Sequence, residues 1–172
     1  MEATVASRRG EPGLTLSPAA LIAAQPGTRL VLPSPNGATP RRVVVGCLRN
    51  ASAVANAVAV EETVAVIAAG ERWGGASGSL RPAIEDQLGA GAIIAALDRE
   101  SCSPEGLVAQ APVLAGCDVA KIVAASGSGQ ELSDAGFADD VHLAVQIDVS
   151  QIVPELQGHQ LMHSASAGRS SP

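Results

Sequence analysis

The stretch Val66–Leu97 reads VIAAGERWGGASGSLRPAIEDQLGAGAIIAAL, and it decides the fold class of this chain. An apolar run, Val64–Ala69, is typical of a buried strand, and it stops at a glycine-rich loop. That loop carries Glu71, Arg72 and Arg81, the densest set of charges beside a strand end in the chain. In α/β proteins, ligands bind at this end of a strand. The stretch therefore predicts both a fold class and a binding loop.

The helix predicted after this loop begins at Pro82, because proline is favoured at the first helical position, and it ends near Leu97. Its first turns carry two adjacent carboxylates, Glu85 and Asp86. A strand, a charged loop and a carboxylate-bearing helix start are the parts with which an α/β protein binds a phosphate and a cation. The structural alternative is that both carboxylates favour the positive end of the helix dipole, by about 0.3–1 kcal/mol each.

Strands and helices alternate through the rest of the chain. Strands are expected over Thr28–Leu32, Arg42–Leu48, Thr63–Ala69 and Ile147–Val153. Further helices are expected within Leu14–Ala24, from the cap Asn50 to about Val60, from the cap Ser103 to about Ala125 with a break near Gly116, and over Gln130–Asp134 and Ala138–Val145. This alternation predicts an α/β fold with three α/β/α layers and a mostly parallel or mixed sheet.

At 172 residues the chain is expected to form a single domain, over residues 14–156. Residues 1–13 and 157–172 are polar and are predicted to be flexible tails. Three cysteines, Cys47, Cys102 and Cys117, show no metal-ligand spacing. Their neighbours are mostly apolar, which predicts buried free thiols of the kind found in a reducing cytoplasm.

Composition excludes several classes of function. The net charge of −6 and the pI near 4.9 disfavour nucleic-acid binding, and the chain has one Trp, one Phe and no Tyr on which bases could stack. No apolar run reaches the roughly 18–20 residues of a membrane span. Charged residues make up 16% of the chain, against about 25% in typical soluble domains. The surface is therefore rich in small residues, or part of it is buried in a homo-oligomer.

Two further loops are candidate binding elements. Ser34, Asn36 and Gly37 follow a predicted strand, where successive backbone N–H groups can form a nest for an anion. The alternative is a rigid turn built on prolines and Asn-Gly. Asn50 follows another predicted strand, where its amide can orient a substrate or cap the next helix.

Other motifs carry weaker signals. Gly70–Gly78 resembles a phosphate loop in composition but lacks the Gly-Lys-Ser/Thr ending of a P-loop. Gly89–Ala92 lies inside a predicted helix, which indicates close packing of that helix on the sheet. Ser126–Gly129 is either a linker or an anion loop. Asp139 and Asp140 form either a capping pair or a further contact to metal or phosphate.

Taken together, several stretches resemble the 2-phosphosulfolactate phosphatase family, from about Leu14 to Leu156. They are LVLPSPNGAT, VVVGCLRNASAVA, VAVIAAGERW, GSLRPAIEDQLGAGAIIAAL and ASGSGQELSDAGFADDVHLAVQIDVSQIVPEL. The resemblance implies a cytoplasmic, Mg²⁺-dependent phosphatase with a layered α/β/α fold. Such enzymes hydrolyse the phosphate ester of 2-phospho-3-sulfolactate to sulfolactate and phosphate, a step that feeds coenzyme M synthesis in some organisms.

On this reading Glu85 and Asp86 bind Mg²⁺, directly or through water. Arg72 and Arg81 neutralise the anionic groups of the substrate, because the guanidinium fork suits phosphate and sulfonate. Glu71 orients the attacking water or acts as a further metal ligand. Substrate contacts are expected from Ser34, Asn36, Gly37 and Asn50.

The sequence departs from the family pattern at one place. Family members begin with a strand followed by an Asp-Val-Leu/Arg-Ala-Thr-Thr type motif, which has no counterpart in this sequence. Without that strand the sheet has an uncovered edge, which favours association of chains, and the pocket lacks one wall. The alternative function is therefore a non-catalytic family remnant that binds an anion or a partner subunit.

Overall fold

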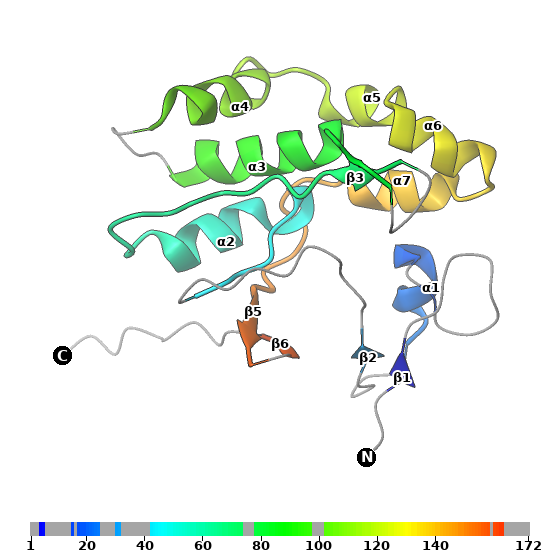
Figure 1. Cartoon of the computed structure of the whole chain (residues 1–172), viewed down its shortest axis with the longest axis horizontal. Helices are drawn as coiled ribbons and strands as arrows, with labels where there is room; N and C mark the ends of the chain where they lie inside the picture. Colours follow the sequence, from blue (N-terminus) through cyan, green and yellow to red (C-terminus); the bar gives the residue numbers. More distant parts are fainter. Residues whose placement is uncertain are drawn as a thin grey trace. The chain divides into compact units, whose positions relative to one another are not determined.

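The computed structural model describes residues 4–5, 15, 17–24, 30–31, 42–73, 78–97, 102–158 and 160–163. The chain divides into two compact units (Figure 1). One contains Met1–Gly37 and Ala120–Val145, and the other contains Ala38–Val119 and Gln146–Pro172. The predicted domain limits stay a prediction.

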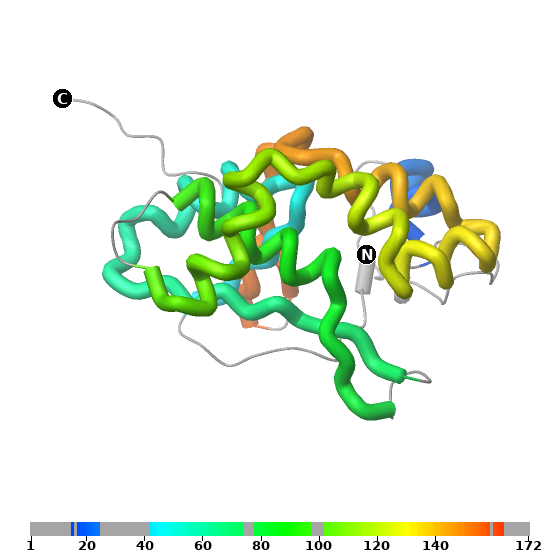
Figure 2. The backbone as a smooth tube through the Cα atoms, turned by 90° about the horizontal axis from the view of Figure 1, so that it is seen from above, coloured from blue at the N-terminus to red at the C-terminus, as the bar shows by residue number. Residues whose placement is uncertain are grey.

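The second unit is built around α3 (Ile84–Leu97), which packs against two other helices. They are α2 (Ala51–Val58), which follows the short helix η1 (Leu48–Asn50), and α4 (Pro104–Leu114). Figures 1 and 2 show α4 running alongside α3. Small aliphatic side chains fill the core of this unit: Leu48, Ala51, Ala53, Val54, Ala55, Val58, Ala83, Leu88, Ala92, Ile93 and Val153.

Short antiparallel strand pairs complete this unit. β3 (Glu71–Arg72) pairs with β4 (Leu80–Arg81), and β5 (Pro154–Gln157) pairs with β6 (Gln160–His163). Gly158, at φ +62°, lies in the turn between β5 and β6. The sequence predicts little structure after residue 157, whereas the structure places residues 160–163 in a strand.

Three strand predictions need correction. The prediction of a buried strand over residues 63–69 is wrong, because this segment pairs with no strand among the described residues and Ile67 is 75% exposed. Residues 147–153 form no strand, and β5 begins immediately after them. Within residues 42–48 only Val44 forms a bridge, antiparallel to Glu155 of β5. Apolar composition shows that a segment can be buried, but burial requires a partner surface.

Some helix boundaries follow the sequence closely, whereas α3 begins at Ile84, two residues after the predicted start at Pro82. Ser103 accepts a hydrogen bond from the backbone N–H of Gly106, and Pro104 begins α4, as predicted. The predicted break near Gly116 is confirmed, since Gly116 has φ +68° and α5 begins at Val119. Caps and prolines act within one helical turn, which explains why the sequence locates these starts.

The N-terminus of α2 is capped in a way that the sequence does not reveal. Asn50 occupies the N-cap position, as predicted, but its side chain makes no capping hydrogen bond. The carboxylate of Asp148 instead accepts hydrogen bonds from the N–H and the hydroxyl of Ser52, at 2.7 and 2.6 Å. The cap therefore comes from a residue 96 positions later in the chain.

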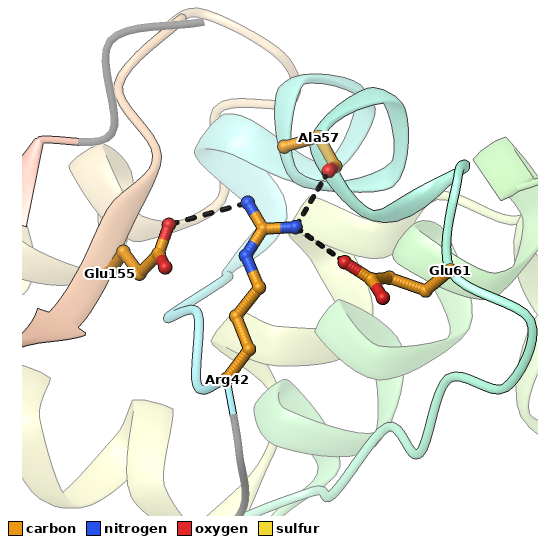
Figure 3. A network of polar contacts seen from close by, with 4 residues as sticks. All are labelled: Arg42, Ala57, Glu61 and Glu155. Atoms are coloured by element: carbon orange, nitrogen blue, oxygen red, sulfur yellow. Dashed lines mark hydrogen bonds and ion pairs between the residues drawn. The ribbon is translucent and has the colours of Figure 1, made fainter. Parts of the chain in front are cut away.

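Arg42 joins the end of α2 to β5 (Figure 3). Its guanidinium donates to the carbonyl oxygen of Ala57 and to Glu61, at 3.1 and 2.9 Å, and to Glu155, at 3.3 Å. The hydrogen bonds to Glu155 and Glu61 raise the pKa of Arg42. This bridge supports the pairing of residues 43–45 with β5, in which Val45 donates its N–H to the Pro154 carbonyl at 2.8 Å.

The first unit is a group of short helices and one parallel strand pair. Its elements are β1 (Thr4–Val5), α1 (Pro18–Ile22), β2 (Leu30–Val31), α5 (Val119–Ala124, which begins at the unit boundary), α6 (Gly127–Asp134) and α7 (Ala138–Ala144). Both α1 and α6 pack against α7, and β1 pairs with β2 in parallel.

Two weak motifs turn out to be helix caps in this unit. The Asp140 side chain is 2% exposed, and it accepts hydrogen bonds from the hydroxyl of Ser17 and the N–H of Ala19, at 2.7 and 3.0 Å. Of the two readings of this aspartate, capping is the one that the contacts support. Ser126 accepts a hydrogen bond from the N–H of Gly129 and caps α6, so this motif is a helix start rather than a linker or an anion loop.

The described residues combine helices with small strand pairs, which is compatible with the α/β class. They contain one parallel and two antiparallel two-stranded sheets. None of the described helices has both the length and the apolar character needed to span a membrane. The prediction of buried thiols is wrong for Cys47 and Cys117, which are exposed, while Cys102 is half-buried, and all three are free.

The glycines of α3 give a test of its packing. A Cβ on Gly91 would lie 2.1 Å from the carbonyl oxygen of Ala109, so this glycine permits close approach of α4 rather than of a sheet. Gly91→Ala is therefore expected to lower the free energy of unfolding by about 1–3 kcal/mol, as overpacking does. Chemical denaturation measures this change.

Gly89→Ala is the matched control in the same helix. A Cβ there would meet its nearest neighbour, the backbone N of Leu48, at 3.7 Å, an ordinary contact. This variant should match the parent or gain up to about 1 kcal/mol, because alanine is the better helix former. Equal stability of the two variants would contradict the packing described.

Candidate functional site

The β3–β4 hairpin and the start of α3 carry five of the predicted site residues, with Glu71 and Arg81 on one face of the hairpin and Arg72 on the other. Glu71 lies opposite Arg81 in the antiparallel pair, and Arg72 lies opposite Leu80. Directly opposite residues project to the same face of a strand pair. β4 then leads through two residues into α3, whose first turn carries Glu85 and Asp86.

A hydrogen bond ties the hairpin to the helix. The backbone N–H of Gly70 donates to Oδ2 of Asp86, at 2.8 Å. Gly70 has φ +76°, and a Cβ there would lie 2.9 Å from the carbonyl oxygen of Arg81. Both the left-handed backbone and the close approach require glycine at this position. Gly70 thus sets the distance between Asp86 and the charged hairpin.

Asp86 lies in an unfavourable environment for a negative charge. Loss of hydration on burial raises the pKa of Asp86, and the charges of Glu85 and Glu71 raise it further, although the Gly70 hydrogen bond opposes this shift. Oε2 of Glu85 is buried with no hydrogen-bond partner among the described residues. Carboxylates that repel one another and lack partners are stabilised by a cation.

The donor set fits a hard divalent cation with few protein ligands. No group of three or more His, Cys, Asp or Glu side chains in the described part of the chain is arranged to hold a metal ion. Magnesium is often bound through one or two carboxylates, with water and substrate phosphate completing its shell. Glu85 and Asp86, with an unpaired buried oxygen and a desolvated carboxylate, fit this role.

The two arginines of the hairpin are held in different ways. Arg72 donates from Nη1 to the carbonyl oxygen of Gly78, at 2.8 Å. The guanidinium of Arg81 lies over the ring of Trp73, 4.7 Å from its centroid. Stacking on an aromatic ring restrains the plane of a guanidinium.

The sequence reasoning missed Trp73. Two features of the sequence could have indicated it: Trp73 is the only tryptophan of the chain, and it directly follows Arg72. Its contact with Arg81, by contrast, follows from the hairpin pairing, which brings together residues that the glycine-rich loop separates in sequence.

A cleft of about 180 Å³ adjoins the carboxylates. Glu85 and Asp86 line it together with apolar residues from four segments of the second unit: Val44, Gly46 and Cys47; Val54 and Val58 of α2; residues 64–69; and Gly89, Ala90 and Ile93 of α3. Sequence reasoning did not find this cleft, because its walls come from segments that only the tertiary structure brings together.

The remaining predicted residues lie elsewhere. Ser34, Asn36 and Gly37 fall outside the described residues. Asn50 is 6% exposed, and its amide is engaged by the backbone: Oδ1 accepts from the N–H of Cys47 at 2.8 Å. Its Nδ2 donates to the carbonyl oxygens of Ile152, at 2.8 Å, and Val45, at 3.3 Å. These contacts give Asn50 a structural role, and its predicted substrate contact stays a prediction.

Comparison with known proteins identifies the family. The family described as 2-phosphosulpholactate phosphatase matches residues 18–159. The chain belongs to this family. It is similar to the 2-phosphosulfolactate phosphatase of Methanothermobacter thermautotrophicus (strain Delta H), with 36% identity over 137 residues. That match covers 74% of this chain and 56% of the relative, so the chain spans little more than half of the length of the phosphatase that it matches.

In this member of the 2-phosphosulfolactate phosphatase family, the environment of Asp86 predicts a pH dependence of stability. Its pKa is raised in the folded protein, so the unfolded chain ionises first as the pH rises. The contribution of Asp86 to stability is therefore present at low pH and is lost as the pH rises through the folded pKa. In EDTA, Asp86→Asn should have a higher melting temperature than the parent at pH 7, and the difference should vanish towards roughly pH 4.

Glu105→Gln is the control for this measurement. Glu105 is an exposed carboxylate in the first turn of α4, and hydrogen bonds from its own backbone N–H and from Ser103 lower its pKa. Removing this charge should give no stabilisation at pH 7. A melting temperature of Asp86→Asn below that of the parent at pH 7 would contradict the electrostatics described for the site.

Proposed function

We propose that this chain is a phosphatase that hydrolyses the phosphate ester of 2-phosphosulfolactate, or of a similar small acidic phosphoester, with the aid of Mg²⁺. The observation that carries the proposal is the gathering of the carboxylates Glu71, Glu85 and Asp86 where the β3–β4 hairpin, which also carries Arg72 and Arg81, is tied to the start of α3. Family membership and the name of the relative support the choice of reaction and substrate.

Glu85 and Asp86 would hold the magnesium ion, with Glu71 close enough for its charge to act on Asp86. A bound Mg²⁺ neutralises the charge on phosphoryl oxygens and so stabilises the transition state of phosphoryl transfer. Its binding would also relieve the repulsion that raises the pKa of Asp86. The repulsion would thus lower the stability of the protein without the cation and raise its affinity for the cation.

The arginines would bind the two anionic ends of the substrate. Arg81, restrained by Trp73, would take one group with its guanidinium fork, and Arg72 would neutralise the other. Glu71 would accept a hydrogen bond from the attacking water and orient it towards phosphorus. The oxygen of the water then forms a bond to phosphorus, the ester P–O bond breaks, and a proton from the water passes to the leaving oxygen, which departs as the alcohol. Further substrate contacts are proposed from Ser34, Asn36, Gly37 and Asn50.

The arrangement of the sheet and helices in layers and the cellular location of the protein are also part of this proposal. We propose a three-layer α/β/α arrangement with a mostly parallel or mixed sheet, as the alternation of strands and helices expected from the sequence implies. The three free cysteines suit a cytoplasmic location, because reducing conditions keep thiols free.

A second candidate function is binding of an anion or a partner without turnover. One observation favours it: among the described residues, no three metal-ligating side chains are arranged to hold an ion. This alternative keeps the role of the arginines and removes that of the carboxylates in catalysis.

Phosphate release from 2-phosphosulfolactate tests the phosphatase directly. The chain should release phosphate with Mg²⁺ and lose this activity in EDTA. Asp86→Asn should lower the rate about 100-fold or more, since even partners outside the metal shell typically contribute 10–100-fold. Glu105→Gln, with the same change of charge, should keep the parent rate. Release that is unaffected by EDTA and by Asp86→Asn would contradict the proposed site.

Tryptophan fluorescence separates anion binding from turnover. Because Trp73 is the only tryptophan and lies against Arg81, an anion bound by Arg81 should change its emission. Inorganic phosphate should produce a saturable change that sodium chloride of equal ionic strength does not. Arg81→Lys should weaken it, because an ammonium lacks the planar fork. A change without phosphate release supports the non-catalytic alternative, and no change contradicts a role of Arg81 in binding.

A further inference from the structure

We propose that the cleft beside Glu85 and Asp86 binds an extended strand of another polypeptide, which pairs with residues 43–47 on one side and with residues 64–69 on the other. Both segments belong to the second unit and line the cleft. Residues 64–69 follow an extended path beside α3 (Figures 1 and 2). The inference holds whether or not the chain is a phosphatase.

The first wall of the cleft is a strand that is paired along one edge. The carbonyl oxygen of Val43 and the N–H of Val45 each form a hydrogen bond of 2.8 Å with β5. Val44 lies between them, opposite Glu155. In an antiparallel pair, a residue in this position directs its own N–H and C=O towards the other edge of the strand. Among the described residues these two groups of Val44 have no hydrogen-bond partner, and Val44 lines the cleft.

The second wall is the edge of an extended segment. All six residues from 64 to 69 line the cleft. Side chains of an extended segment point alternately to two sides, so consecutive residues share one surface where their backbone edge faces it. No hydrogen bond joins residues 63–69 to any other part of the chain that the structure describes. The cleft therefore lies between two backbone edges that carry unpaired N–H and C=O groups.

A polypeptide strand is the occupant that fits two such walls. It has N–H and C=O groups along both edges, so it can pair with both walls at once, as the middle strand of a sheet does. A helix cannot do so, because its backbone groups bond within the helix. Residues 63–69 of a second copy are not this strand, because in each copy residues 64–69 already form a wall of the cleft.

The surroundings of the cleft define the side chains of the bound strand. The cleft has a volume of about 180 Å³, and a Cβ on Gly46 would lie 2.5 Å from Ile93 of α3. Positions that face the helices therefore need small side chains such as alanine. Val45 and Ile67 are 44% and 75% exposed. Positions on the outer face therefore suit valine, which would cover these two side chains.

The charge of the cleft favours a basic strand. Glu85 and Asp86 line it, and no lysine or arginine does so among the described residues. Oε2 of Glu85 is buried with no hydrogen-bond partner among those residues. The hydrogen bond from Gly70 to Asp86 places both carboxylates beside the end of residues 64–69. A lysine at the end of the bound strand would pair with Glu85. Because Mg²⁺ would compete for these carboxylates, the strand is tested in EDTA.

A synthetic peptide tests the cleft. The probe is a capped peptide of seven residues, with lysine at both ends and alternating valine and alanine between them. Calorimetric titration of the full chain should show saturable binding of one peptide per chain. The same peptide with N-methyl groups on both alanines should bind at least about tenfold more weakly, because it keeps the side chains and loses the donors of one edge. Replacing both lysines by glutamate should also weaken binding.

Two variants of α3 test the location of the bound peptide. Ala90 is half-buried and lines the cleft, so Ala90→Leu should fill the space and weaken peptide binding at least about tenfold. Ala96→Leu is the matched control, because Ala96 is exposed on the same helix and does not line the cleft. It should bind the peptide like the parent. Circular dichroism establishes that both variants fold.

Amide hydrogen exchange tests insertion between the two walls. The amides of Val44 and of residues 64–69 should exchange freely in the unbound chain and become protected when the unmethylated peptide is bound. Absence of binding, equal affinity of the N-methylated peptide, or protection of one wall alone would each overturn the proposal. Protection of both walls without peptide, together with a dimer in light scattering, would assign the cleft to a second copy and would also overturn it.

Discussion

The buried amide of Asn50 is the interaction on which the second unit depends. It binds the backbone at Val45 and Cys47 on one side and at Ile152 on the other, so one side chain fixes segments that are 102 residues apart. A buried amide must have partners, because an unsatisfied polar group costs about 1–3 kcal/mol. The requirement works in both directions, since the three backbone groups also need partners.

Other contacts join the same segments that the Asn50 amide holds together. Ser150 donates its N–H to the carbonyl oxygen of Arg49, Asp148 caps α2, and residues 43–45 pair with β5. Arg42 adds its bridge at the outer side of the same region. Together they hold α2 in place, and α2 in turn packs against α3, which carries the carboxylates of the candidate site. The position of the site therefore depends on polar contacts far from it in sequence.

The environment of the ionised Asp86 carboxylate lowers the stability of the folded protein. Burial and two neighbouring negative charges act against ionised Asp86, and a single backbone hydrogen bond from Gly70 acts for it. A protein retains such an arrangement where function needs it, because most substitutions of an unfavourable charge would stabilise the fold.

The sequence by itself determined the features that act over short distances. Ser17, Ser103 and the prolines after them located helix starts, since a cap contacts N–H groups two or three residues away. The grouping of Glu71, Arg72, Arg81, Glu85 and Asp86 was visible because one hairpin and one helix turn carry them all. What only the tertiary structure decided is which distant groups meet: Asp148 with Ser52, Asp140 with Ser17, and Arg81 with Trp73. It also left most of residues 63–69 exposed. An apolar run shows that a segment can be buried, while burial itself depends on a surface that other parts of the chain must supply.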